Sequence, residues 1–489
     1  MPTTSQEAPT ATRHLILLVV LYSLAVVVTL QPVIDPDIWW HLRTGEWILQ
    51  HGTVPTTDPF SAYGQGKPWL EYSWLFDLAT YGLYQAAGLR GFLVYQFILL
   101  FAILLALQHL VMLVTSQLAR STVLATLAFM AMVRLSGPRS YLVSILFFVL
   151  VMIAVVRAHR DGRRGPLYLL PLLFVLWANI HIQFVYGLVI LGAVTLDAML
   201  TRWWDGAPDS PIPLKALLLV DAGCVLATLV TPYHVRLYAV LHDVAAQTGV
   251  YWFNEEMRAP QFRFLTDWVV LGLTLGGAFV LDRARHPRFL VLLYLLGVFV
   301  SFRSGRDVWF VVVCAALIVA MTDTASGDVL AAREMPPGTR WRAAVITVVI
   351  FAVLCSLKPS ATLEAEVKGK FPDGAARAVM DGGYTGPMYN HFNWGGYLIW
   401  RLPTFLVSMD GRSHVHGDAR ILQALRTWSG LGDWESDPEL SRAGVVIAST
   451  DMALASLLRH DRRFREVYSD DIARVFVARP GPATSPTRP

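Results

Sequence analysis

The chain has 489 residues, of which 55% belong to the hydrophobic class and only 16% are charged. A typical soluble domain is roughly a quarter charged, so this composition excludes an ordinary soluble protein. The formal net charge of +4 does not indicate a nucleic-acid binder. The three cysteines lack the spacing of a disulfide framework or a thiolate metal site. Long apolar runs instead predict a polytopic helical membrane protein with an appended polar domain.

The apolar runs are interpreted as transmembrane helices. Residues 1–13 and 480–489 are polar and are predicted to be disordered. The run at residues 15–30 has no small-residue cleavage pattern before Asp35, which favours an uncleaved first span over a signal peptide. Further apolar segments, several of them short against the roughly 20 residues that a span needs, complete about eleven spans within residues 14–358. They centre near Leu100, Ala128, Phe148, Phe174, Leu191, Val225, Leu273, Leu295, Val313 and Val349.

Loop charges predict the orientation of these spans. With the N-terminus in the cytoplasm, the inside loops are basic, whereas residues 31–91 fall outside and are mostly acidic. This asymmetry follows the positive-inside rule and also places residues 231–266 and everything after Lys358 outside. The count requires splitting the uncharged stretch 166–196 at residues 179–183, because polar groups inside a lipid-facing helix are costly and a turn accommodates them better.

Residues 359–479 have a soluble composition. Strands are predicted at residues 405–409 and 443–449, and a hairpin at residues 464–468 and 472–478. Helix-like stretches separate these strands, which predicts a small extracytoplasmic α/β domain. The expected fold class is therefore a polytopic α-helical membrane protein with a C-terminal α/β domain.

Two carboxylates follow the first predicted span directly. Asp35 and Asp37 stand where a lipid headgroup would be presented, and Pro36 keeps Asp35 extended, so both acids can point at one centre. A carboxylate there could act as general base on an acceptor hydroxyl, or coordinate a divalent cation that neutralises a phosphate. The alternative is that the acids are solvated polar residues at a helix end and that Trp39 and Trp40 form an interfacial aromatic belt.

Arginines occur at predicted membrane ends on the outer side, where positive-inside statistics disfavour them. They are Arg134, Arg139, Arg303 and Arg306. The rigid donor fork of arginine suits a phosphate, so we assign phosphate binding to Arg303 or Arg306. The alternatives are snorkelling to headgroups and a salt bridge with Asp307.

Several motifs together resemble one group of bacterial membrane proteins. The first-loop run DPDIWWHLRTGEWIL, Arg134 with PRSY at 138–141, WANIH at 177–181 and TLVTPY at 228–233 are similar to stretches of that group. FNWGGYLIWRLP at 392–403 and MDGR at 409–412 resemble its C-terminal signature. The group belongs to the GT-C superfamily, which includes protein O-mannosyltransferases, aminoarabinose transferase and oligosaccharyltransferases. The resemblance covers most of the chain.

The resemblance implies an enzyme of the bacterial cytoplasmic membrane that takes a sugar from a polyprenyl-phosphate donor. It implies transfer to an extracytoplasmic glycan, lipid or protein acceptor, usually with inversion, with a first-loop acid as base. Carried to this chain, that acid is Asp35 or Asp37, and we favour Asp37 because Ile38 and Trp39 can anchor its loop. Mannosyl- and aminoarabinose-transferases have Asp-Glu where this sequence has Asp-Pro-Asp, so a Mg²⁺ or Mn²⁺ cofactor at these acids stays open.

Other polar residues are candidates for substrate binding, each with a structural alternative. They are His41, Glu71, His181, Glu255 and Glu256, for which the alternatives include a hydrogen-bonded loop residue at His41, a polar turn at His181 and an interfacial helix residue at Glu71. In the C-terminal domain, acceptor recognition and plain domain packing are equally good interpretations of Trp394, Asp410 and Arg412. No catalytic role is assigned to the C-terminal domain.

The sequence therefore predicts a membrane glycosyltransferase. One alternative is a transporter or flippase of lipid-linked substrates, but the chain lacks paired Gly/Pro-broken helices in corresponding halves and has few ionisable residues inside its spans. Another is a non-catalytic assembly protein whose C-terminal domain binds a cell-wall component.

Overall fold

The computed structural model describes residues 7–32, 35–204, 211–246, 249, 254–322 and 338–479. Their contacts divide the chain into two units, each considered by itself below. Unit 1 includes the first helix, Arg90–Leu237 and Asn254–Pro359, and unit 2 includes Pro32–Leu89, Tyr238–Phe253 and the chain from Ser360 onward. Nearly all of the predicted first loop, residues 31–91, thus belongs to the same unit as the C-terminal domain.

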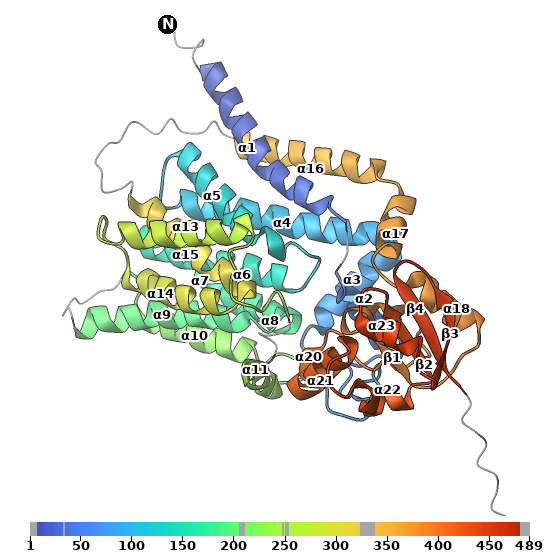
Figure 1. Ribbon diagram of the computed structural model, residues 1–489. Coiled ribbons are helices and arrows are strands. Elements are labelled where there is room, and N and C mark those ends of the chain that lie inside the picture. Colours follow the sequence, from blue (N-terminus) through green and yellow to red (C-terminus); the bar gives the residue numbers. More distant parts are fainter. Residues whose placement is uncertain are drawn as a thin grey trace, which may run out of the picture. The chain divides into compact units, whose positions relative to one another are not determined.

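Unit 1 is helical (Figure 1). Its helices are α1 (Glu7–Thr29), α4 (Leu89–Met112), α5 (Leu118–Met132), η1 (Val133–Leu135), α6 (Tyr141–Asp161), α7 (Gly165–Tyr168), α8 (Leu170–Ile180), α9 (Phe184–Trp203), α10 (Leu214–Ala227), α13 (Leu265–Val280), α14 (Arg288–Arg303), η2 (Gly305–Asp307), α15 (Val308–Met321) and α16 (Thr339–Leu357). Every predicted apolar segment forms a helix. Because α1 begins at Glu7, residues 7–13 are helical and not disordered as expected. The predicted disorder of residues 1–6 and 480–489 lies outside the described residues.

Among the described residues, 6 helices are long and apolar enough to cross a membrane. They are α1, α4, α5 with η1, α6, α9 and α16, while α8 and α13 are apolar but shorter. The chain is therefore a multi-pass membrane protein with a small C-terminal sheet domain. A crossing by each of the eleven predicted segments stays a prediction.

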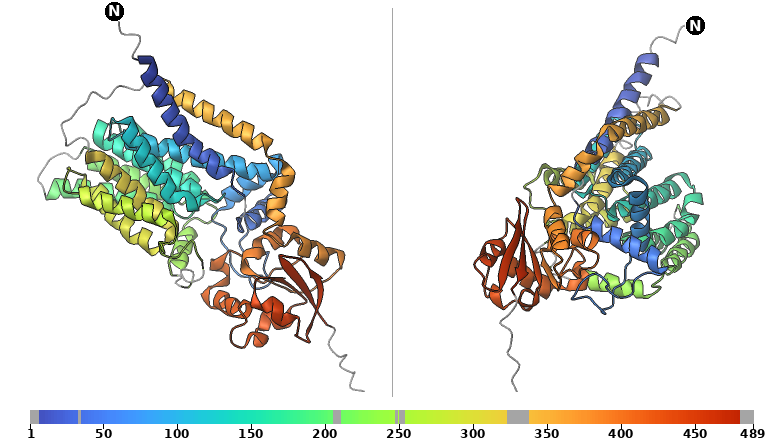
Figure 2. Two further views of the ribbon diagram at one scale, coloured as in Figure 1. Left: turned by 45° about the horizontal axis from the view of Figure 1, so that its top comes forward. Right: turned by 90° about the vertical axis from the view of Figure 1, so that its right-hand side faces the viewer.

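Helix α15 forms the interior of unit 1. Most of its side chains are buried, and it packs against α5, α13 and α14. Its sequence is apolar on all sides, as expected for a helix covered all round. Gly297 of α14 allows a close approach, since a Cβ atom there would lie 3.0 Å from the Cα atom of Val311. At another edge of the unit, α1 and α16 lie side by side although they are far apart in sequence (Figure 2).

The polar turn predicted at residues 179–183 is confirmed. Helix α8 ends at Ile180 and α9 begins at Phe184, and His181 between them is extended, with φ −158° and ψ 143°. The Asn179 side chain donates to the backbone carbonyl of Val230 at 2.8 Å. Asn179 also donates to the carbonyl of Val175 at 2.8 Å, so its amide has partners both inside and outside its own helix.

Unit 2 combines helices with one sheet. Its elements are α2 (Ile38–His51), α3 (Trp74–Ala87), most of α11 (Arg236–Ala246), α17 (Ser360–Lys368), α18 (Asp373–Asp381), β1 (Met388–Asn390), η4 (Phe392–Trp394), α19 (Gly395–Arg401), α20 (Ser413–His416), α21 (Asp418–Trp428), η5 (Trp434–Ser436), α22 (Pro438–Arg442), β2 (Val445–Ser449), α23 (Ala453–Leu458), β3 (Phe464–Ser469) and β4 (Ala473–Ala478). The strand order is β1-β2-β4-β3. β1 and β2 are parallel, while β4 is antiparallel to both β2 and β3. The predicted β3–β4 hairpin and the strand at β2 are confirmed.

The sheet has helices packed against its strands. Val446 and Phe476 share a core with residues of α21, α22 and α23, while α18 contacts β3 and β4. Strand β2 is buried along most of its length, which explains why its sequence is a continuous apolar run.

The strand predicted at residues 405–409 is wrong. The segment is irregular and makes only an isolated bridge, in which Val407 donates to the carbonyl of Phe60 at 3.1 Å and accepts from Ala62 at 3.0 Å. Val407 and Met409 are buried, because the segment lies between the first loop and Asn390, whose side-chain oxygen accepts from the N–H of Ser408 at 2.9 Å. The segment therefore has the apolar sequence pattern of a strand, but no neighbouring strand in the described part of the chain pairs with it along its length.

Candidate functional site

The first-loop acids lie at the start of α2. Asp37 immediately precedes the helix, and its backbone N–H donates to Oδ1 of Asp35 at 2.8 Å. The next residues anchor the helix, because Trp39 and Trp40 are 3% and 8% exposed. The ring of Trp39 packs edge-on against Tyr397 of α19, with centroids 5.1 Å apart. The tryptophans thus belong to the interior of unit 2 and do not form an exposed aromatic belt.

The first-loop acids are suited to hold a divalent cation. Mg²⁺ is commonly bound by one or two carboxylates together with water and substrate oxygens, and Asp35 and Asp37 would supply two, although Asp35 also accepts the backbone N–H of Asp37. Among the described residues, no three His, Cys, Asp or Glu side chains gather as metal ligands would. A Mg²⁺ or Mn²⁺ held by Asp35 and Asp37 stays a prediction.

Arg412 is fully buried in unit 2 and holds two carboxylates. Its Nε and Nη2 donate to Asp410 at 2.8 and 2.7 Å, and its Nη1 donates to Asp58 at 2.8 Å. The guanidinium also lies 4.5 Å from the ring centroid of Trp69. Burial opposes the charge of Asp410, but Arg412 and His416 outweigh that effect and hold its pKa well below the usual range. The network ties the first loop to the C-terminal segment.

Glu71 and His41 lie in the buried surroundings of this network. Glu71 is 1% exposed and accepts from the backbone N–H of Ser73 at 2.8 Å. Burial raises the pKa of Glu71 to about 7, against the opposing effects of that hydrogen bond and of Arg412. Burial and the nearby Glu71 charge likewise raise the pKa of Asp77, whose Oδ1 is 2.5 Å from Nδ1 of His41. The alternative for His41 was a hydrogen bond within a loop, whereas its contact with Asp77 joins helices α2 and α3.

The C-terminal candidates are buried in the same unit. Trp394 ends η4, is 7% exposed, and its ring lies 6.1 Å from that of His391 in an edge-on arrangement. Asp410 and Arg412 face each other inside the network described above. Of the two interpretations of these residues, their burial favours domain packing.

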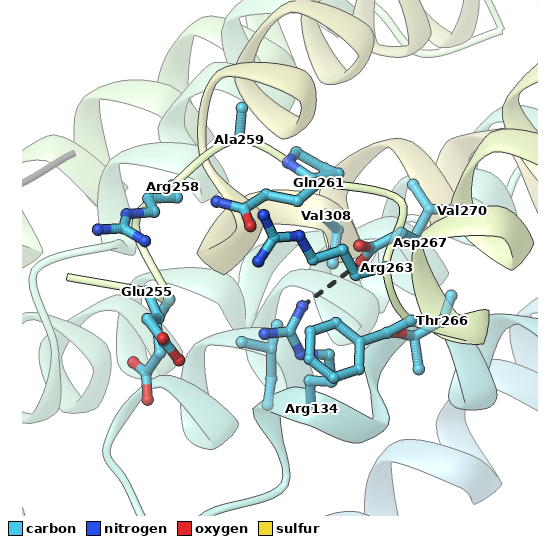
Figure 3. A pocket seen from close by; sticks show the side chains of 16 residues that line it. Arg134, Glu255, Arg258, Ala259, Gln261, Arg263, Thr266, Asp267, Val270 and Val308 are labelled. Atoms are coloured by element: carbon cyan, nitrogen blue, oxygen red, sulfur yellow. Dashed lines mark ion pairs between the residues drawn. The ribbon is translucent and has the colours of Figure 1, made fainter. Parts of the chain in front are cut away.

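A cavity of about 150 Å³ lies within unit 1 at the ends of apolar helices (Figure 3). Arg134 of η1, Asp267 in the first turn of α13 and Val308 at the start of α15 line it. Arg134 is 3.6 Å from Asp267 and lies 4.2 Å from the ring centroid of Phe264. Polar groups therefore converge where the apolar segments stop.

The loop that crosses the cavity contributes more charge. Arg258 and Arg263 line it together with Glu255 and Gln261. In Figure 3 the Arg263 and Gln261 side chains lie near Arg134, while Arg258 lies on the side of Glu255. This loop stays close to the turn after α14, because the N–H of Gly305 donates to the carbonyl of Arg258 at 2.8 Å.

Glu256 joins two of the predicted arginines. Its Oε2 is 2.9 Å from Nη2 of Arg306 and 3.3 Å from Nη1 of Arg139. Burial raises the pKa of Glu256, but the guanidinium groups of Arg139 and Arg306 lower it further, so that the pKa is about 2. Asp307, the alternative partner of Arg306, accepts instead from Gln183 at 2.9 Å. Of the predicted residues, Arg134, Glu255 and Glu256 thus line one cavity, and Arg139 and Arg306 are linked to it through Glu256.

Replacing Glu256 with glutamine should lower thermal stability in a pH-dependent way. A carboxyl whose pKa falls from the usual 4.5 to about 2 on folding contributes stability above pH 4.5, and that contribution is lost as the pH falls toward 2. The stability difference between wild type and Glu256→Gln should therefore be constant from pH 8 to pH 5 and shrink below it. Thermal unfolding over this pH range measures the difference, and one that persists unchanged to pH 3 would contradict the ion-pair account.

Two other predicted residues lie apart from this cavity. Arg303, in the last turn of α14, is exposed and is not among the described residues that line it. His181 is 7% exposed, and its Nδ1 is 2.8 Å from the hydroxyl of Ser144, which accepts from Nε1 of Trp177 at 2.8 Å. His181 therefore faces the helical interior.

Sequence reasoning missed several charged residues. Arg258, Arg263 and Asp267 line the cavity, and Asp58 and Asp77 belong to the buried surroundings of Arg412. A signal was present for Asp267, because an acid in the first turn of an apolar helix stands at a membrane end just as the chosen arginines do. Asp58 carries no comparable signal, since its partner is 354 positions away.

No protein-family model and no curated protein matches the chain. Its fold is similar to that of the archaeal oligosaccharyltransferase AglB from Archaeoglobus fulgidus in complex with an inhibitory peptide and a dolichol-phosphate, with a TM-score of 0.56 and 11% identity over 89% of this chain and 69% of that one. An Archaeoglobus fulgidus oligosaccharyltransferase tethered to an acceptor peptide matches with a TM-score of 0.54 and 11% identity, over 91% and 69% of the two chains.

ArnT from Cupriavidus metallidurans in the apo state is also similar. It matches with a TM-score of 0.52 and 15% identity, over 96% of this chain and 98% of that one. At such identities the likeness concerns the fold alone. The chain thus shares the fold of the oligosaccharyltransferase AglB and of ArnT.

Proposed function

We propose that the chain is a membrane glycosyltransferase that moves a sugar from a polyprenyl-phosphate donor to an acceptor. The fold supports this proposal, because it matches an oligosaccharyltransferase whose structure contains a dolichol-phosphate and an inhibitory peptide. The acceptor is a glycan, lipid or protein on the extracytoplasmic face of the bacterial cytoplasmic membrane, with the N-terminus of the enzyme inside.

The observation that carries the proposal is the arginine-rich cavity of unit 1. Arg134, Arg258 and Arg263 line it with Glu255, Glu256 and Asp267, and Arg139 and Arg306 lie outside the lining as partners of Glu256. Counted with these two partners, the guanidinium groups outnumber the carboxylates, and arginine can donate to a phosphate in a fork. The cavity also lies at the ends of apolar helices, which is the depth at which a lipid phosphate resides.

In the proposed reaction the carboxylate of Asp37 takes the proton of an acceptor hydroxyl. The hydroxyl oxygen bonds to the anomeric carbon of the sugar while the bond from that carbon to the phosphate oxygen breaks. The phosphate leaves with the electron pair, and the arginines stabilise its developing charge. Attack opposite the leaving group inverts the anomeric centre.

Replacing Arg306 with glutamine should weaken donor binding. A hydrogen bond to a charged group contributes about 1.5–3 kcal/mol, so the KM for the donor should rise roughly 10- to 100-fold. Arg283→Gln is the matched control, because Arg283 is exposed in the loop after α13 and lies over the ring of Phe279. Steady-state kinetics over donor concentration measures both, and equal KM values in the two variants would remove Arg306 from the phosphate site.

The direct test is donor consumption. Purified protein in detergent or proteoliposomes is incubated with a panel of polyprenyl-phosphate sugars and candidate acceptors, and mass spectrometry follows the loss of donor and the appearance of free polyprenyl phosphate. Release of the lipid phosphate with at least one donor is expected. Movement of an intact donor across the bilayer without its consumption would favour a flippase instead.

A further inference from the structure

The backbone of Gly411 lies directly against the carboxylate of Asp37 within unit 2. A Cβ atom at residue 411 would be 1.9 Å from Oδ1 and 2.8 Å from Cγ of Asp37, which is closer than real Cβ contacts. The φ angle of Gly411 does not lie in the left-handed region, so an alanine could adopt its backbone conformation. The neighbouring carboxylate is therefore what requires a glycine here.

The segment that contains Gly411 is held on both sides. Before it, the Asn390 amide donates to the carbonyl of Met409 at 2.8 Å, and its oxygen accepts from the N–H of Ser408 at 2.9 Å. After it, the guanidinium of Arg412 lies buried among two carboxylates. These contacts on both sides therefore oppose a shift of the backbone at residue 411.

Helix α19 brings the two loops together through its first two residues. A Cβ atom at Gly395 would lie 2.0 Å from the carbonyl oxygen of Met409, and one at Gly396 would lie 2.6 Å from that of Pro36. The backbone of α19 thus contacts the loop before Gly411 on one side and the loop of Asp37 on the other.

We infer that Gly411 is a positioning residue that sets the direction of the Asp37 carboxylate. The inference rests on the proposed function, in which Asp37 takes the acceptor proton. Because the carboxylate ends a flexible side chain and the backbone at 411 is held, a methyl group there displaces the carboxylate. A displacement of about 1 Å in a reacting group can cost about 10²-fold in rate.

The test compares Gly411→Ala with Gly82→Ala in the purified full-length protein. Gly82 lies on the exposed side of α3 in the same unit, where an added Cβ atom meets nothing within 4 Å. We expect Gly411→Ala to lower kcat about 10²-fold while the KM for the polyprenyl-phosphate sugar stays unchanged. Gly82→Ala should change neither, and a merely structural role of Gly411 would not separate kcat from KM.

A stability cycle provides the second measurement. Asp37→Ala removes the atoms that the new methyl group would meet, so any loss of thermal stability in Gly411→Ala should disappear in the double variant. If Gly411→Ala alone does not fold, recovery of folding in the double variant supports the contact. A loss that persists without the Asp37 carboxylate overturns the inference.

These measurements distinguish a failure of the positioning role of Gly411 from a failure of the proposed glycosyltransferase function. Turnover by the wild type with an unchanged kcat in Gly411→Ala overturns the inference alone. Absence of turnover by the wild type with every donor overturns the proposed function, and the positioning role falls with it. A lowered kcat at constant KM supports both.

Discussion

Replacing Asp37 with asparagine is expected to lower turnover by about 10²- to 10⁴-fold, the range over which a positioned general base accelerates a reaction. The amide matches the carboxylate in shape but does not take the acceptor proton at neutral pH. Because an asparagine has nearly the same volume, it should fit against Gly411 as the acid does. Membrane insertion and yield should therefore be preserved, and product formation from a polyprenyl-phosphate sugar measures the loss.

Asp35→Asn is the matched comparison for this prediction. The side-chain oxygen of an asparagine can still accept the backbone N–H of Asp37, so the turn before α2 should be kept. We expect a smaller loss of turnover than in Asp37→Asn. The reverse order would assign the base to Asp35, and full turnover in both single variants would end the assignment of the base to this loop.

Replacing Arg412 with methionine should destabilise the protein by about 3–5 kcal/mol, as is typical when one partner of a buried ion pair is removed. Asp58 and Asp410, neither of which has an exposed side chain, would lose the cation that compensates them. Thermal unfolding and the fraction of monodisperse protein after purification report the loss. Adding Asp58→Asn and Asp410→Asn should recover part of it, because neutral amides are less costly to bury than unpaired carboxylates.

Lys368→Met is the control for that substitution. Lys368 and Glu364 pair at 3.4 Å on α17, with side chains 49% and 57% exposed. An exposed pair of this kind contributes about 0–1 kcal/mol, so its loss should hardly change stability. Equal effects of Lys368→Met and Arg412→Met would contradict the account of Arg412 as the cation of a buried network.

Local patterns were sufficient for most of the helices and for part of the sheet. Each apolar run predicted as a span forms a helix, and the polar turn before α9 was visible in the sequence around His181. The β3–β4 hairpin was predicted because its strands are adjacent along the chain. A strand was wrongly predicted at residues 405–409, because residues that pack against a distant segment can have the same apolar pattern as a strand.

The candidate site was predicted less completely. Arg134, Arg139, Arg306 and Glu256 were singled out one at a time, from their place at membrane ends and from a family likeness. In the fold, Arg134 and Glu256 line one cavity, and Arg139 and Arg306 pair with Glu256. No local feature predicts that Glu256 joins Arg306, because the pair is 50 positions apart.

By itself, the sequence determined that the chain is a multi-pass helical protein with a polar domain at its end, since hydrophobic length and charge are properties of neighbouring residues. Only the tertiary structure decided that Arg412 is enclosed by acids from two segments and that Gly411 meets the carboxylate of Asp37. The physical reason is that a buried charge needs an opposite charge from wherever the fold supplies one, and that a close backbone approach leaves no trace in the sequence except a glycine.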